Sequence, residues 1–168
     1  VVRTMDIYVS AFLNKPVFNQ SKERIGSVHD LVVNDIGKEH PRITGLIINR
    51  GINKKLVFIP EHDVLEFSTK HIKLNTDIVY LTPFELRDDE VLLNKEVYDK
   101  QIIDIDDRRL TRVNDLLLEQ KNRSMYLKGV DVTFAGILRR LHLPTLPSLI
   151  KPNSVDWEDV QFLGGNDP

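Results

Sequence analysis

The chain has 168 residues, of which 41% are hydrophobic and 29% charged, so it contains enough apolar material for one or two ordinary globular cores. Its 23 Lys and Arg residues nearly balance its 25 Asp and Glu residues, which is too even for the electrostatic attraction that dominates nucleic-acid binding. Without cysteine it has neither disulfides nor thiolate zinc sites, and no run approaches the roughly 20 apolar residues of a membrane-spanning helix. We expect a cytoplasmic protein without membrane insertion.

Short apolar segments separated by turn residues follow one another along the chain, a pattern typical of an all-β sandwich or barrel. The clearest hairpin pairs residues 42–50 with 55–60, because Gly51 between them can adopt the positive φ of a tight turn. Solvated turns are expected at residues 20–23 and 105–108, each ahead of a further apolar segment. The predicted fold class is therefore mainly β.

The segment of residues 24–33 has an ambiguous pattern. Ile25, Val28 and Leu31 recur at a spacing of three, which by period alone suits a helix. Gly26 and the β-branched residues favour a strand, and a bulge near Ser27 would reconcile the spacing. We predict a strand.

The chain contains an internal repeat. Three blocks recur in the same order, with offsets of 85, 84 and 96 residues: 24–33 on 109–118, 44–46 on 128–130, and 60–64 on 156–160. The rise in offset indicates an insertion of about a dozen residues in the second copy. We therefore expect two small β-barrels in tandem, over residues 1–82 and 83–168, with the boundary near Pro83.

A short helix is expected at the start of the second copy, where Asp88 can cap a helical run through Val91, Leu92 and Val97.

A second helix is expected in the insert, at about residues 133–143, where Thr133 is the cap and Arg139 and Arg140 point away from the apolar face. That face is the predicted interaction face, which either docks a partner helix or a second protomer, or plugs the open end of the second barrel. Its members are Phe134, Ile137, Leu138 and Leu141.

The residues that could carry chemistry have structural explanations. Asp104, Asp106 and Asp107 are weak candidates as oxygen ligands for Mg²⁺ or Ca²⁺, because they lack the central Gly and closing Glu of an EF-hand loop; a solvated turn, which favours Asp for backbone reasons, is the better explanation. Asp30 and Asp115 occupy equivalent repeat positions, where an Asp can accept hydrogen bonds from the backbone of a neighbouring turn.

Signatures of catalysis are missing from the sequence. The five histidines are scattered, and the chain has no Gly-x-Ser-x-Gly elbow and no Gly-rich phosphate loop. We expect a protein that is not an enzyme, with no catalytic residues and no cofactor of its own.

The motifs, taken in order, resemble those of the PRC-barrel family of small β-barrels. The first copy carries residues 12–17 (FLNKPV), 24–32, 43–46 (ITGL) and 58–60 (FIP); the second carries 90–93, 100–104, 112–115, 129–132 and the 136–141 insert. The second copy departs from the first at Thr111, where Gly26 stands, and at Asp156, where Pro60 stands.

The pair of copies is similar to the tandem PRC barrels of MgtE-type, CBS-containing magnesium transporter-like proteins. This resemblance implies a non-catalytic regulatory or adaptor domain, attached to C-terminal domains beyond this chain and acting on a membrane transporter or a second protomer. Any Mg²⁺ dependence would then come through those absent domains. Two alternatives remain: an RNA- or ribosome-associated adaptor of the RimM kind, although nucleic acid is disfavoured by the charge, and a dimerising structural module.

Overall fold

The computed structural model describes residues 7–51, 55–77, 84–144 and 153–163 and is mainly β. The strands, in chain order, are β1 (Ile7–Tyr8), β2 (Pro16–Phe18), β3 (Arg24–Asn34), β4 (Arg42–Arg50), β5 (Lys55–Pro60), β6 (Val64–Phe67), β7 (Ile72–Leu74), β8 (Glu90–Leu92), β9 (Gln101–Asp104), β10 (Arg109–Arg112), β11 (Asp115–Lys121), β12 (Ser124–Asp131), β13 (Ser154–Asp156) and β14 (Val160–Phe162). The helical segments are the 3₁₀ turns η1 (Val9–Ala11), η2 (Glu61–Asp63) and η5 (Trp157–Asp159), the π-helical turn η3 (Leu93–Val97) and the helix α1 (Phe134–Arg140).

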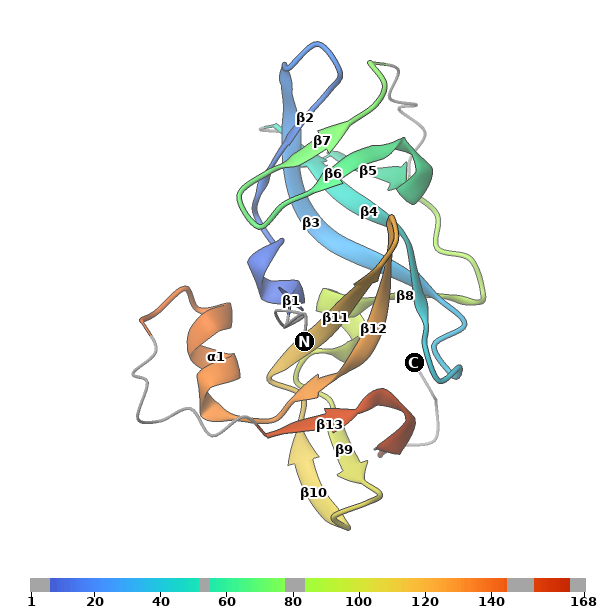
Figure 1. The fold of residues 1–168 in the computed structure, drawn as a ribbon, viewed down its shortest axis with the longest axis vertical. Coiled ribbons are helices and arrows are strands. Elements are labelled where there is room, and N and C mark those ends of the chain that lie inside the picture. The colour runs from blue at the N-terminus through green and yellow to red at the C-terminus, as the bar shows by residue number, and fades with distance from the viewer. Residues whose placement is uncertain (1–6, 52–54, 78–83, 145–152, 164–168) are drawn as a thin grey trace.

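A curled sheet runs through both halves of the chain (Figure 1). It has 11 strands, in the order β1-β11-β12-β4-β3-β2-β7-β6, with β5, β8 and β13 branching from this path. The short strand β1 pairs with β11, and β8 pairs with β3. Each half of the chain therefore adds a strand to the part of the sheet that the other half builds.

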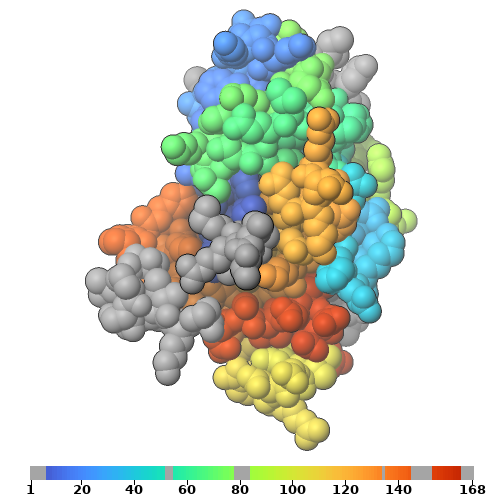
Figure 2. All heavy atoms as spheres, viewed as in Figure 1, coloured from blue at the N-terminus to red at the C-terminus, as the bar shows by residue number. Residues whose placement is uncertain are grey.

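The strands of the C-terminal half are divided between two sheets. β11, β12 and β13 extend the large sheet, whereas β10, β9 and β14 form a separate sheet of three strands. In Figure 2 the β9–β10 segment projects at the end of the molecule opposite the β2–β3 turn. The hydrophobic core nevertheless continues through both halves, from Val9 and Phe12 to Val155 and Trp157. The main core thus spans both halves, and a second, smaller cluster consists of Val32, Ile47 and Leu92.

Several local predictions are confirmed. β4 and β5 pair in antiparallel register, and Gly51 after β4 has a φ of 75°. Residues 24–33 lie within strand β3, whose pairing with β4 shifts register twice; the first shift falls between Val28 and Asp30, slightly beyond the predicted bulge at Ser27.

The helix predicted from Asp88 through Val97 is wrong for residues 90–92. These residues form β8, which pairs with the end of β3, and only Leu93 to Val97 are helical, in a π-type turn. The strand buries Val91 and the edge of β3 supplies its hydrogen bonds, so tertiary pairing overrides the local periodicity. The predicted boundary at Pro83 lies outside the described residues.

The helix α1 begins after Thr133, whose hydroxyl accepts a hydrogen bond from the Gly136 N–H at 3.3 Å, the geometry of an N-cap. Along the described part of the chain, no helix has the length and hydrophobicity that a bilayer crossing requires.

Candidate functional site

A group of polar side chains with little exposure lies where η1, η3, β11 and α1 meet. Its centre is Asp115, the first residue of β11, which is 0% exposed. The Asp115 carboxylate accepts hydrogen bonds from the Ser10 hydroxyl at 2.6 Å, from the Tyr98 hydroxyl at 2.7 Å and from the Leu116 N–H at 2.9 Å. The Ser10 N–H donates to it as well, at 3.3 Å. We call this group, with the residues described next, the Asp115 cluster.

Arg139 of α1 supplies the positive charge of the Asp115 cluster. Its guanidinium forms ion pairs with Asp115, at 3.5 Å, and with Asp131, and it lies 3.8 Å from the centre of the Tyr8 ring. Arg140, the next residue of α1, forms an ion pair with Asp99 and lies over the face of the Tyr98 ring. Carboxylates inside a protein need a cation or several hydrogen-bond donors to remain charged. This requirement explains why the side of α1 that carries Arg139 is turned toward Asp115 and Asp131.

Tyr98 is a hydrogen-bond donor in this cluster and is not available as a base. Burial raises the pKa of the Tyr98 hydroxyl far above its ordinary value, and the negative charge of Asp115 and the hydrogen bond to it raise the pKa further. The phenol therefore keeps its proton at neutral pH and donates it in the hydrogen bond to Asp115.

Asp30 is the counterpart of Asp115 in the N-terminal half. It is also 0% exposed, and its carboxylate accepts hydrogen bonds from the N–H groups of Leu31 and Asn94, both at 2.7 Å, and of Lys95 at 3.0 Å. No Lys or Arg within the described residues forms an ion pair with it. Burial raises the pKa of Asp30 to about 6, and the three backbone donors oppose this rise.

Two of the predicted metal candidates lie together around an arginine. Asp104 is buried on β9 and accepts a hydrogen bond from the Asp107 N–H at 3.1 Å. Arg109 forms ion pairs with both side chains, at 3.7 Å in the case of Asp104. Asp106 is exposed. One cation, Arg109, thus offsets part of the negative charge within the β9–β10 hairpin, in agreement with the reading as a turn, and ion binding at these residues stays a prediction.

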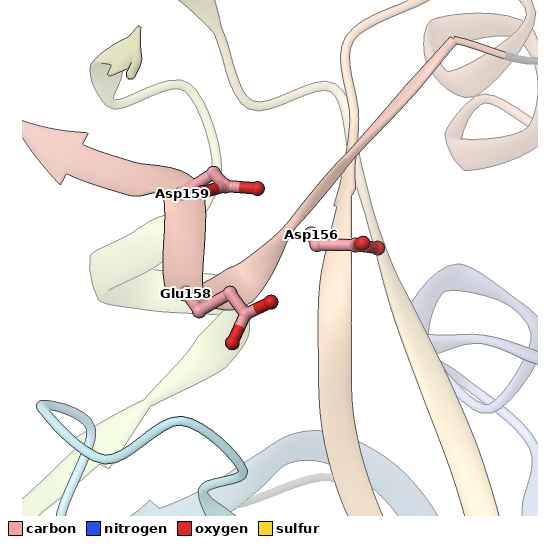
Figure 3. Close-up of side chains that lie close together, drawn as sticks. All are labelled: Asp156, Glu158 and Asp159. Atoms are coloured by element: carbon pink, nitrogen blue, oxygen red, sulfur yellow. The ribbon is translucent and has the colours of Figure 1, made fainter. Parts of the chain in front are cut away.

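Three other carboxylates, which are not the predicted metal candidates, lie close together in the structure. Asp156, Glu158 and Asp159, on β13 and the following turn η5, have oxygen atoms within 4.8 Å of one another (Figure 3). This group was not predicted from the sequence, although the short acidic run around Trp157 marks it. Asp156 and Glu158 are exposed, and solvated carboxylates of this kind are common without an ion.

The predicted interaction face on α1 is partly accessible. Ile137 and Leu138 are half-buried, Leu141 is 59% exposed, and the side chain of Phe134 lies outside the described part. The small residues Ala135 and Gly136 form the side of α1 that is buried. Whether the other side binds a partner stays a prediction.

Comparison with known proteins identifies the first half of the chain. Residues 5–87 match the family model described as the PRC-barrel domain, so a PRC-barrel domain is present there. This confirms the resemblance for residues 5–87. A search of curated proteins found no match. A second PRC unit and a relation to MgtE-type transporters find no support in these comparisons and stay predictions.

Proposed function

We propose that this chain, with its PRC-barrel domain at residues 5–87, is a non-catalytic regulatory or adaptor module made of two PRC-type units. The observation that carries the proposal is a reciprocal contact between the halves. Asp30 in the first half accepts hydrogen bonds from the Asn94 and Lys95 backbone, and Asp115 in the second accepts them from Ser10. A module held together in this way keeps a fixed orientation of its surfaces, which is what an adaptor requires.

Matching geometry at the start of each half supports the two-unit organisation. Asn14 and Asp99 both have a positive φ, of 64° and 65° respectively. The Asn14 N–H donates to the Val28 carbonyl at 2.8 Å, and the Asp99 N–H donates to the Val113 carbonyl at 3.1 Å. Each pair of equivalent residues is 85 positions apart, the offset of the first repeated block.

Two glycines support the same organisation further along the chain. A Cβ atom on Gly45 would lie 2.5 Å from the Ile59 carbonyl oxygen, and one on Gly129 would lie 2.4 Å from the Val155 carbonyl oxygen. In both halves the neighbouring strand approaches so closely that only glycine fits. The offsets, 84 for the glycines and 96 for the carbonyls, are those of the second and third repeated blocks.

The chemistry of the Asp115 cluster favours the absence of catalysis. A general base or nucleophile needs a free position beside the substrate, with a pKa near the working pH. Tyr98 keeps its proton, and the Asp115 carboxylate is bound by Arg139 and by four hydrogen-bond donors. These residues hold the halves together, and that role accounts for their burial.

The adaptor role is tested by a pair of matched variants on exposed leucines. Leu141 is 59% exposed on the predicted interaction face, and Leu65 is 66% exposed on β6 in the other half. Leu141→Asp is expected to abolish cross-linking of the chain to a specific partner, whereas Leu65→Asp leaves it intact. Equal effects of the two variants would contradict a role for this face.

The finer part of the proposal is that the module belongs to a cytoplasmic, magnesium-transporter-related protein and acts on attached C-terminal domains or a transporter. It is supported by the sequence resemblance of the second half. A CBS pair encoded after Pro168 would support it further. Calorimetric titration with Mg²⁺ tests direct sensing, and a titration without heat or stabilisation would assign Mg²⁺ sensing to the attached domains.

A further inference from the structure

A hollow of about 520 Å³ lies in the first half of the chain, where the beginning of β3 is next to the end of β4. The β2–β3 turn, beside it in the chain, is at the top of Figure 1, and β10 is at the bottom. The residues that line the hollow are Arg24, Ile25, Gly26, Ser27, Asn49, Arg50 and Gly51. Two of them are arginines, and none is acidic.

The positive charges around this hollow form no ion pair with any residue that the structure describes. The Arg50 Nε donates to the Ile25 carbonyl at 3.3 Å, which fixes the guanidinium at the wall of the hollow. Lys55 lies directly opposite Arg50 in the β4–β5 register, and like charges in that position destabilise a sheet. The Arg24 side chain makes no hydrogen bond or ion pair with another described residue. The folded chain thus gathers cations here at a cost in stability.

The neutral residues of the hollow add unused hydrogen-bonding capacity. The side-chain oxygen of Asn49 is buried without a hydrogen-bond partner. Rotation of the Asn49 amide by half a turn would place its NH₂ group at the same position, as a donor. Ser27, on the neighbouring strand, also lines the hollow and carries a hydroxyl that can donate.

The corresponding arginine of the second half is satisfied internally. Arg109 is 85 residues after Arg24, the offset of the repeated block, and it pairs with Asp104 and Asp107. The first half has a cation at this position without the carboxylates. An external anion would supply the missing partner.

We propose that the Arg24–Arg50 pocket, defined by the seven lining residues, binds the phosphate group of a small soluble phosphate ester. Guanidinium forks match phosphate oxygens in geometry and form charge-assisted hydrogen bonds with them. The volume lies within the range of small-molecule sites and exceeds what a phosphate ion needs, so there is room for the attached organic group. The pocket lies in the first half alone, so its failure would leave the proposed adaptor role untouched.

The test is a titration of the intact chain with three probes, followed by ¹⁵N NMR and calorimetry: adenosine monophosphate, inorganic phosphate and uncharged adenosine. Adenosine monophosphate is expected to bind and to shift the amide signals of Gly26 and Gly51, and adenosine is expected not to bind. Arg24→Gln and Arg50→Gln should each weaken binding by about tenfold or more, because each removes a charge-assisted hydrogen bond. Arg109→Gln is the matched control and should leave binding unchanged.

The outcomes separate the sources of the phosphate. Inorganic phosphate binding as tightly as adenosine monophosphate would support the pocket and assign the free ion as its ligand. Failure of both anions to bind at millimolar concentration would overturn the proposal, as would equal losses in Arg24→Gln and Arg109→Gln. Because Arg24 is exposed, Arg24→Gln should keep the fold, and its amide spectrum would verify this.

Discussion

The buried carboxyl of Asp30 should make the stability of this protein depend on pH between about 4 and 6. Its pKa rises from 3.8 to about 6 because burial penalises the charged form. The folded chain therefore holds this proton more tightly than the unfolded chain does. The resulting stability is complete below pH 3.8 and is lost as the pH rises through about 6. A shift of this size corresponds to about 3 kcal/mol.

The variant Asp30→Asn isolates this contribution. Its side-chain oxygen can still accept the hydrogen bonds of Leu31 and Asn94, but its NH₂ group meets the N–H of Lys95 donor to donor, at a cost of about 1–3 kcal/mol. At pH 4 the variant should be less stable than the wild type. From pH 4 to 6 the wild type should lose about 2 kcal/mol more than the variant, which cannot ionise, because part of the full effect lies outside this interval.

Urea unfolding at half-unit steps of pH from 4 to 7 measures the difference. The single tryptophan, Trp157, is buried and reports unfolding by fluorescence. The matched control is Asp106→Asn, in the exposed β9–β10 turn, which should follow the wild type at every pH. Parallel stability curves for the wild type and Asp30→Asn between pH 4 and 6 would refute the reasoning, since they would mean that Asp30 ionises equally in both states.

Three further substitutions test the packing and the contacts between the halves by chemical denaturation. Asp115→Ala leaves several donors and a cation without their buried acceptor and should cost about 3–5 kcal/mol; a loss below about 1 kcal/mol would contradict the role of the cluster. Gly129→Ala sets a Cβ 2.4 Å from the Val155 carbonyl oxygen and should cost at least about 1–3 kcal/mol, whereas Gly37→Ala, with open space around it, should be neutral. Thr133→Ala removes the N-cap of α1 and should cost about 1 kcal/mol, and an unchanged midpoint would argue against the cap.

Features encoded by neighbouring residues were predictable from the sequence. The β4–β5 hairpin follows from the apolar segments around Gly51, and its two strands have the predicted bounds. The turn between β9 and β10 follows from a run of Asp residues ending at Arg108, which has a φ of 54°. In both places the local preference and the tertiary structure agree, so the sequence pattern is sufficient.

Features that depend on distant partners were not predictable. Val91 and Leu92 carry a helical pattern, yet they pair with β3, a strand about 60 positions earlier in the chain. Arg139 has the spacing of a solvent-facing residue, yet two carboxylates from β11 and β12 bind it. The one usable signal for the Asp115 cluster was the recurrence of an Asp inside an apolar block, at Asp30 and Asp115. That recurrence predicted backbone donors near each Asp, but not that they would come from the other half.

Each half of the chain supplies hydrogen-bond donors and a strand to the other, and this has a thermodynamic consequence. Separated from the second half, Asp30 would lose the donors of η3 and β3 would lose its partner β8; separated from the first, Asp115 would lose Ser10 and β11 would lose β1. Each half alone would hold a buried carboxylate with too few partners, a state that costs several kcal/mol. The two halves should therefore unfold as one cooperative unit. It follows that a ligand in the Arg24–Arg50 pocket, although it touches only the first half, would raise the unfolding midpoint of the second half by the same amount.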